Sequence, residues 1–78
     1  MPKTLRTQKH KALISVLRAT RLEREFTQRQ LSAKLKRAEN FMARIESGER
    51  RLDIGEFFEI AGALDVDPVV LFTRVARW

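Results

Sequence analysis

Apolar residues recur at helical spacing along the 78-residue chain and divide it into five short segments. In the first, Leu13, Val16 and Leu17 have the i, i+3, i+4 spacing of one buried helical stripe. Thr20 falls on the same stripe and weakens it. The pattern therefore predicts a first helix over residues 9–24, packed through this side against the rest of the chain.

Residues 27–51 contain two shorter segments, which we expect to form a pair of helices joined by a tight turn. Thr27 and Gln30 have the spacing of a capping box, in which two side chains satisfy backbone donors at a helix start. Leu31 and Leu35 are four residues apart and share one face of this helix. Helices this short are not stable in isolation, so the other segments must support them.

The second helix of this pair is predicted over residues 38–47. Phe41, Met42 and Ile45 lie on its apolar side. Gly48 ends it, because glycine readily adopts the left-handed conformation that follows a helix. The opposite side carries small and polar residues, namely Glu39, Asn40, Ala43 and Ser47, with Arg44 flanking them.

A fourth helix is predicted to begin at Asp53, which forms a second capping-box spacing with Glu56, and to end near Asp65. Its wide apolar face comprises Ile54, Phe57, Phe58, Ala61 and Leu64. The sequence predicts that this face packs into the core.

A fifth helix is predicted to begin at Asp67 and Pro68, with aspartate as the cap and proline at the first helical position. One stripe of this helix is formed by Leu71, Phe72, Val75 and Trp78. Val69 and Val70 point elsewhere. We expect one side to contact the core and the other to be a candidate partner surface.

Together these segments predict an all-α fold, a compact five-helix bundle that contains a helix-turn-helix, with residues 9–78 as a single domain. Residues 1–8 are expected to form a basic N-terminal arm. Residues 67–78 are a possible dimerisation helix.

Charge is distributed unevenly along the chain. Residues 1–51 contain 14 lysines and arginines against five aspartates and glutamates, whereas residues 52–78 contain two against five. A basic majority of this kind favours contact with a polyanion such as nucleic acid. The alternative is that the surface cations only aid solubility.

Several function classes are disfavoured by the composition. The chain has no cysteine and one histidine, so we expect no disulfide and no metal cluster. No apolar run approaches the roughly 18 residues of a membrane span, and no signal peptide is evident. No nucleophile–base pair or phosphate-binding glycine loop is present, so we predict neither enzymatic activity nor a cofactor or small-molecule ligand. A cytoplasmic location is expected.

The helix pair suggests a mechanism for nucleic-acid binding. One helix fits into the DNA major groove, where its early side chains reach base edges. The preceding helix crosses the backbone and offers its N-terminal amides to phosphate. A tight helical hairpin can also be purely structural, so pattern and charge alone leave both interpretations open.

The stretch TQRQLSAKL…NFMARIESGERRL…EFFEIAGALDVDPVVLF resembles the Cro/repressor-type (Xre-type) helix-turn-helix family of bacterial and phage transcription regulators, over residues 13–72. The resemblance implies a lambda-repressor-like DNA-binding domain. Glu25 and Lys36 depart from the family pattern, because glycine is common at both positions. Lys36 and Arg37 are expected to form the turn between the two helices, and because neither is glycine, any left-handed residue there would carry strain.

The resemblance also implies roles for individual residues. Arg21 and Glu46 would form a structural ion pair between the first and third helices, and Gln28 would bind a phosphate and brace the recognition helix. The expected base-contacting residues are Ala38, Glu39, Asn40, Ala43 and Arg44. The other expected contacts to the DNA backbone come from Arg37, Arg50 and Arg51.

The side-chain chemistry agrees, because asparagine pairs with adenine, arginine with guanine, and glutamate accepts from cytosine. Alternatives remain for several of these residues. Glu39 could simply favour a helix start, Arg44 could contact phosphate, and Arg50 and Arg51 could be solvated charges.

We therefore predict a sequence-specific regulator of transcription that binds double-stranded DNA, represses as a homodimer on a pseudo-palindromic operator, and associates with the nucleoid. The expected dimer interface comprises Val69, Val70, Val75 and Trp78. The alternative is a protein-interaction or antitoxin-like module whose last helix covers a partner, with DNA binding secondary.

Overall fold

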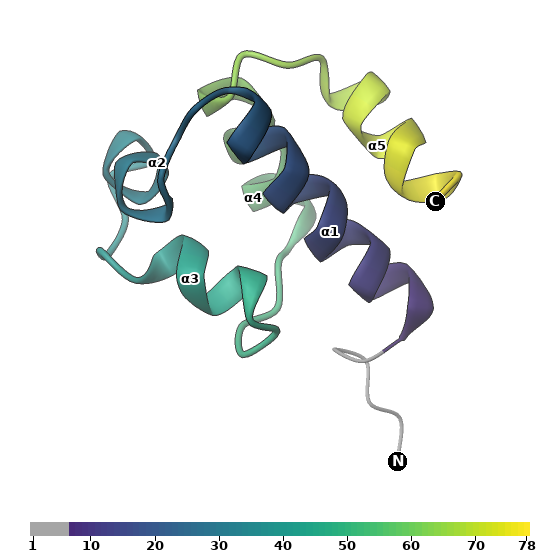
Figure 1. The fold of residues 1–78 in the computed structure, drawn as a ribbon, viewed down its shortest axis with the longest axis horizontal. Coiled ribbons are helices and arrows are strands. Elements are labelled where there is room, and N and C mark those ends of the chain that lie inside the picture. The colour runs from purple at the N-terminus through teal and green to yellow at the C-terminus, as the bar shows by residue number, and fades with distance from the viewer. Residues whose placement is uncertain (1–6) are drawn as a thin grey trace.

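The computed structural model describes residues 7–78, so most of the predicted basic arm lies outside the described residues. Five helices and no strand are found in the described part of the chain. They are α1 (Gln8–Glu23), α2 (Gln28–Lys34), α3 (Phe41–Glu46), α4 (Ile54–Ala63) and α5 (Pro68–Ala76). In Figure 1, α1 runs through the middle, with α2 and α3 on one side, α5 on the other and α4 behind. The all-α prediction is confirmed.

Two predicted boundaries are wrong. The arm was expected to include residues 7 and 8, but Thr7 caps α1 and Gln8 is the first residue of that helix. The third helix was expected from residue 38, but α3 begins at Phe41, whose backbone N–H donates to the Ala38 carbonyl at 2.9 Å. Residues 38–40 therefore form a turn ahead of α3.

Local sequence explains the helix starts. Thr27 with Gln30, and Asp53 with Glu56, each form a complete capping box. Asp67 accepts a hydrogen bond from the Val69 N–H, with proline in the first turn of α5. These side chains satisfy backbone donors that have no partner within the helix.

Four helix ends share one reversal, at Glu25, Lys36, Gly48 and Asp65, and three of these residues are not glycine. Glu25, Lys36 and Asp65 each have φ near +60°, and the residue after each one donates to the carbonyl five positions back, as in a Schellman motif. The left-handed conformation costs a non-glycine residue about 1–2 kcal/mol. Glu25 and Lys36, the two positions where the resemblance implies glycine, thus keep the left-handed geometry, and the strain expected in the turn of Lys36 and Arg37 falls on Lys36.

The core lies where all five helices meet. Its buried apolar residues are Val16, Leu17, Leu31, Phe41, Met42, Ile45, Phe57, Ile60, Ala61, Leu64 and Leu71. Thr20 is buried beside them without a polar penalty, because its hydroxyl donates to the Val16 carbonyl at 2.7 Å and accepts from Arg74 at 3.1 Å. Thr20 was expected only to weaken the apolar stripe of the first helix. Its hydrogen bond with Arg74 instead joins α1 to α5.

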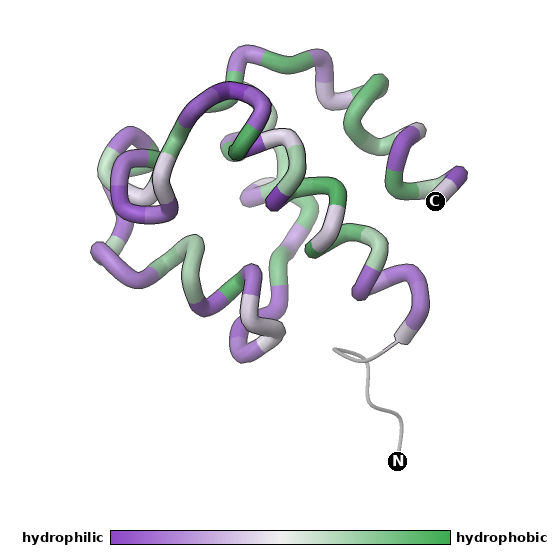
Figure 2. Tube along the Cα trace, viewed as in Figure 1, coloured by the Kyte–Doolittle hydropathy of each residue, from purple (hydrophilic) through white to green (hydrophobic). Residues whose placement is uncertain are grey.

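The apolar faces of α4 and α5 are wider than the core can cover. Ile54, Phe58 and Phe72 were expected to face inward, but all three are more than half exposed. Trp78, placed on the same stripe as Leu71, is also exposed. Figure 2 shows hydrophobic residues along the first turns of α5, whereas hydrophilic residues dominate α2 and its neighbouring turns. The exposed large apolar side chains of the described residues therefore lie mostly on α4 and α5.

Candidate nucleic-acid interface

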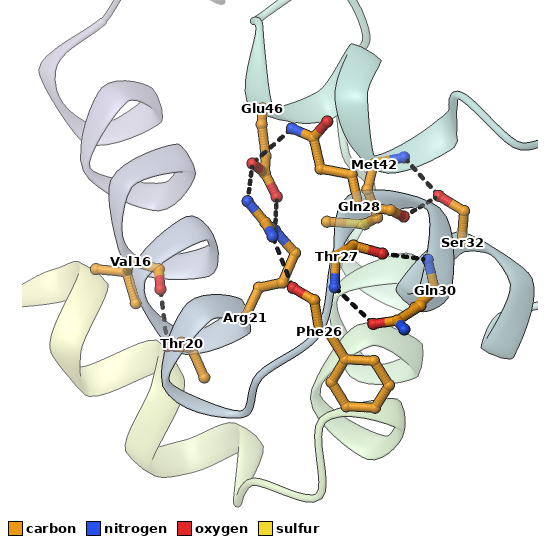
Figure 3. A network of polar contacts seen from close by, with 10 residues as sticks. All are labelled: Val16, Thr20, Arg21, Phe26, Thr27, Gln28, Gln30, Ser32, Met42 and Glu46. Atoms are coloured by element: carbon orange, nitrogen blue, oxygen red, sulfur yellow. Dashed lines mark hydrogen bonds and ion pairs between the residues drawn. The ribbon is translucent and has the colours of Figure 1, made fainter.

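The turn between α2 and α3 is held by a buried hydroxyl. Ser32 lies in α2, donates to the Gln28 carbonyl at 2.8 Å and accepts from the Met42 backbone N–H at 3.0 Å (Figure 3). One side chain thus satisfies a backbone group of each helix. The first turn of α3 is thereby tied directly to α2.

A second network fixes α3 against α1. The Arg21 guanidinium donates to Glu46 through Nε at 2.7 Å and Nη2 at 3.1 Å, and through Nη1 to the Phe26 carbonyl at 2.7 Å. The Arg21 and Glu46 side chains are 7% and 3% exposed. The ion pair implied by the family resemblance is therefore present and buried.

Gln28 completes this network, which we call the Glu46 cluster (Arg21, Gln28 and Glu46). Its Nε2 donates to Glu46 Oε1 at 2.9 Å, so α1, α2 and α3 converge on one carboxylate (Figure 3). The expected bracing role of Gln28 is seen, whereas its phosphate contact stays a prediction. A fixed helix angle matters for recognition, because base contacts require side chains to reach the groove in register.

The five residues expected to contact bases, which we call the reading residues, lie together in the turn before α3 and on that helix. Ala38, Glu39 and Asn40 are exposed in the turn, and Arg44 is exposed on the helix, with Ala43 half-buried between them. Asn40 is the N-cap residue, but its side chain makes no capping hydrogen bond. The side-chain amide of Asn40 is therefore not occupied by capping α3.

Two of the reading residues have ionic partners. Glu39 pairs with Arg29 of α2, and Arg44 Nε lies 3.4 Å from Glu49 Oε1. Both pairs are solvent-exposed, so each contributes little to stability and exchanges readily for another partner. Arg29 is a neighbour of the reading surface that sequence reasoning missed.

The predicted backbone contacts divide into two kinds. Arg51 is exposed. Arg37 and Arg50 instead approach Glu56 of α4, with Arg50 Nη1 and Nη2 at 2.9 and 2.8 Å and Arg37 Nη1 at 3.2 Å from its oxygens. Sequence reasoning assigned Glu56 only to the capping box. Its pair with Arg37 gave no local signal, since the two residues are 19 positions apart, and its pair with Arg50, six positions away, fits no helical or capping spacing.

Hydrogen bonds from Arg50 lower the pKa of Glu56 to about 2, while burial acts in the opposite direction. The same hydrogen bonds raise the pKa of Arg50. Both groups are therefore charged at neutral pH. We call this arrangement the Glu56 cluster (Arg37, Arg50 and Glu56).

The predicted dimer residues do not form one surface of equal exposure. Val69, Val70 and Trp78 are exposed, but Val75 is half-buried and packs against the core of its own chain. Val69 also borders a hollow of about 220 Å³ between α4 and α5, where its exposed apolar neighbours Ile54, Phe58 and Phe72 had been expected to face the core. The residues that line the hollow are Ile54, Phe57, Phe58, Pro68, Val69 and Phe72.

Within residues 7–78, no helix has the length and hydropathy needed to cross a membrane. The same residues contain no group of three or more metal-ligating side chains.

Known proteins share this arrangement of helices. The helix-turn-helix family model matches residues 17–71, more than half of the chain. An XRE-family like protein from Pseudomonas syringae pv. tomato str. DC3000 is 32% identical and superposes with a TM-score of 0.84, covering 96% of this chain and 94% of that one. The chain belongs to the Xre-type helix-turn-helix family. No curated protein sequence matches it significantly.

Another similar structure is the wild-type restriction-modification controller protein C.Esp1396I, with 27% identity, a TM-score of 0.83 and 91% of each chain covered. As an Xre-type helix-turn-helix protein, the chain is a DNA-binding transcriptional regulator. In helix-turn-helix proteins the second helix of the motif enters the major groove and the first supports it, and α3 and α2 hold these two positions in the chain.

Proposed function

We propose that this Xre-type regulator recognises a specific double-stranded DNA sequence through the turn and helix at residues 38–44. The observation that carries the proposal is the set of exposed side chains at the start of α3, held in place from behind by the Glu46 cluster. A rigid support with open base-reading groups is the arrangement that direct readout requires.

Individual roles follow from chemistry and position. Asn40 pairs with adenine and Arg44 with guanine, while Ala43 permits close approach to the groove floor. Glu39 accepts from cytosine once its exposed pairing with Arg29 opens. Gln28 and Arg51 contact phosphates on either side. Because it binds chromosomal DNA in this proposal, the regulator acts at the nucleoid.

Selection of bound duplexes from a random pool tests the proposal, with an enriched sequence as the expected result. Asn40→Ala should then lose about 1–3 kcal/mol of discrimination at the bases it contacts. Arg51→Ala should weaken all sequences alike and reduce the salt dependence by about one phosphate contact. Arg77→Ala, which removes the same charge at the end of α5, serves as the control. No enrichment from the pool would refute sequence-specific binding.

We further propose that two copies associate through the exposed apolar surface of α4 and α5 and repress transcription by occupying a pseudo-palindromic operator. One recognition helix reads only a few base pairs, and a dimer places two copies about 34 Å apart on one face of the DNA. Ile54, Phe58, Val69 and Phe72 form an exposed apolar patch of the kind that marks an interaction site.

Sedimentation equilibrium measures this association directly. Val69→Ser should shift the population toward monomer, because it removes apolar area from the patch. Leu22→Ser is the matched control, since Leu22 is similarly exposed but lies on α1. The competing role, an antitoxin-like module, is favoured by the same patch. It predicts a monomer that forms a stoichiometric complex with one different protein, and that outcome would replace the homodimer.

A further inference from the structure

Glu56 of α4 contacts both ends of the segment that carries α3, residues 37–50, which we call the recognition segment. Arg37 precedes α3 and Arg50 follows it, and both guanidinium groups reach the Glu56 carboxylate. Arg37 also reaches Glu59 Oε1 at 3.1 Å through its second terminal nitrogen. The segment carrying α3 is thus anchored on both sides to one residue of a neighbouring helix.

An aromatic ring organises the same two cations. The Arg37 and Arg50 guanidinium carbons lie 4.7 and 4.9 Å from the centroid of the Phe41 ring. Phe41 is the first residue of α3 and is buried. Because each guanidinium stacks on this ring and pairs with a carboxylate, both side chains have defined positions beside the start of α3.

Exposure shows what these positions leave available. The Glu56 side chain is 9% exposed, whereas those of Arg37 and Arg50 are 32% and 31% exposed. Each arginine therefore contacts the carboxylate and also remains partly accessible to solvent beside the start of α3. Pairing with Glu56 removes part of the positive charge that would otherwise attract any phosphate backbone.

From this geometry we infer that Glu56 is a positioning residue that sets the ratio of specific to non-specific DNA binding. It holds Arg37 and Arg50 against Phe41, which fixes the approach of α3, and it restrains both arginines from indiscriminate phosphate contact. The inference rests on the sequence-specific binding proposed above and adds a residue of α4, outside the helix-turn-helix, to the determinants of that specificity.

The test compares wild type with Glu56→Gln, using the selected operator duplex and a scrambled duplex over a series of salt concentrations. Glutamine keeps the capping box, as Gln30 shows at the equivalent position of α2. Glu23→Gln is the control, since Glu23 is an exposed carboxylate paired with Arg74, away from α3. It removes the same charge without touching the Glu56 cluster.

For Glu56→Gln we expect several-fold tighter binding to scrambled DNA and a salt dependence steeper by about one released counterion, because one or both arginines become free. The operator-to-scrambled affinity ratio should fall about tenfold. A purely structural role would weaken binding to both duplexes without steepening the salt dependence. That result, or a ratio equal to that of Glu23→Gln, would overturn the inference.

Glu56→Asp separates position from charge and serves if the glutamine variant does not fold. Aspartate keeps the negative charge but is one methylene shorter, so it cannot reach both arginines in the same geometry. We expect a reduced affinity ratio, with a salt dependence on scrambled DNA between those of wild type and Glu56→Gln, and an unchanged ratio would contradict the positioning role. If wild type itself does not discriminate between the duplexes, sequence-specific binding fails together with this inference; discrimination that survives both substitutions refutes only the role of Glu56.

Discussion

The Glu46 and Glu56 clusters each place one carboxylate among cationic or amide donors, yet they differ in where those donors point. In the Glu46 cluster, the Arg21 side chain is 7% exposed, and it donates its hydrogen bonds to groups of the protein. In the Glu56 cluster, Arg37 and Arg50 remain about one-third exposed. The first cluster therefore fixes helices to one another, whereas the second holds cations that can still meet a ligand.

The comparison has an energetic side. A buried ion pair is costly to disrupt because the remaining charge loses its partner without regaining water. A partly exposed pair retains solvent as an alternative partner, so its contribution to stability is smaller. The two clusters should therefore separate in stability measurements, with the Glu46 cluster the more sensitive.

The largest effect is expected from Glu46→Ala. It leaves the Arg21 guanidinium buried without a carboxylate, and we expect a loss of about 3–5 kcal/mol in the free energy of unfolding. For a domain of this size the melting temperature should fall by more than about 12 °C. Circular dichroism during heating and in urea measures both quantities.

Glu39→Ala is the control for that experiment, since its pair with Arg29 is exposed and should contribute at most about 1 kcal/mol. Equal losses for the two variants would show that burial of the Arg21–Glu46 pair has no energetic consequence.

Glu56→Gln should have an intermediate and pH-dependent effect, with a loss of about 1–3 kcal/mol at pH 7. The pKa of Glu56 is lowered from 4.5 to about 2 in the folded chain, so its carboxylate stabilises the fold above pH 4.5. That contribution declines as the pH falls toward 2.

Urea unfolding of wild type and Glu56→Gln at several pH values gives the difference directly. The difference in the free energy of unfolding between the two proteins should be constant above about pH 5. It should shrink as the pH falls from 4.5 to 2. A gap that is independent of pH would mean that the ionised carboxylate is not the source of the stabilisation.

A smaller gain is expected from Lys36→Gly, in the turn that separates α2 from the reading residues. Lys36 has φ +59°, a conformation that glycine adopts without the 1–2 kcal/mol penalty, although glycine loses about 0.5–1 kcal/mol through its flexible unfolded state. The net gain should be about 0.5–1 kcal/mol in urea unfolding. Lys36→Ala keeps the backbone strain and removes the side chain, so it should not be stabilised.

The smallest effect is expected from Glu59→Gln. Glu59 is 56% exposed and contacts only Arg37 of the Glu56 cluster. We expect a change below about 0.5 kcal/mol in urea unfolding, which salt screening should abolish. A loss as large as that of Glu56→Gln would mean that exposure does not distinguish the members of this network.

Much of the candidate site could be predicted from sequence because its signals are local or belong to the family. The Thr27–Gln30 box is a spacing of three residues, and it begins α2 as expected. The Arg21–Glu46 pair spans 25 residues, and only the family resemblance implied it. The predicted start of α3 was three residues too early, since the residues before Phe41 continue the helical sequence pattern without forming the helix.

The sequence by itself determined the five helices, the caps of α2, α4 and α5, and the apolar stripes that form the core, because each depends on residues a few positions apart. Only the tertiary structure decided that Ile54, Phe58 and Phe72 are exposed, since five short helices enclose too little volume to cover every apolar side chain. It also decided that Glu56 meets Arg37 and Arg50. Opposite charges are abundant in this chain, and only packing of α4 against the recognition segment selects which of them become partners.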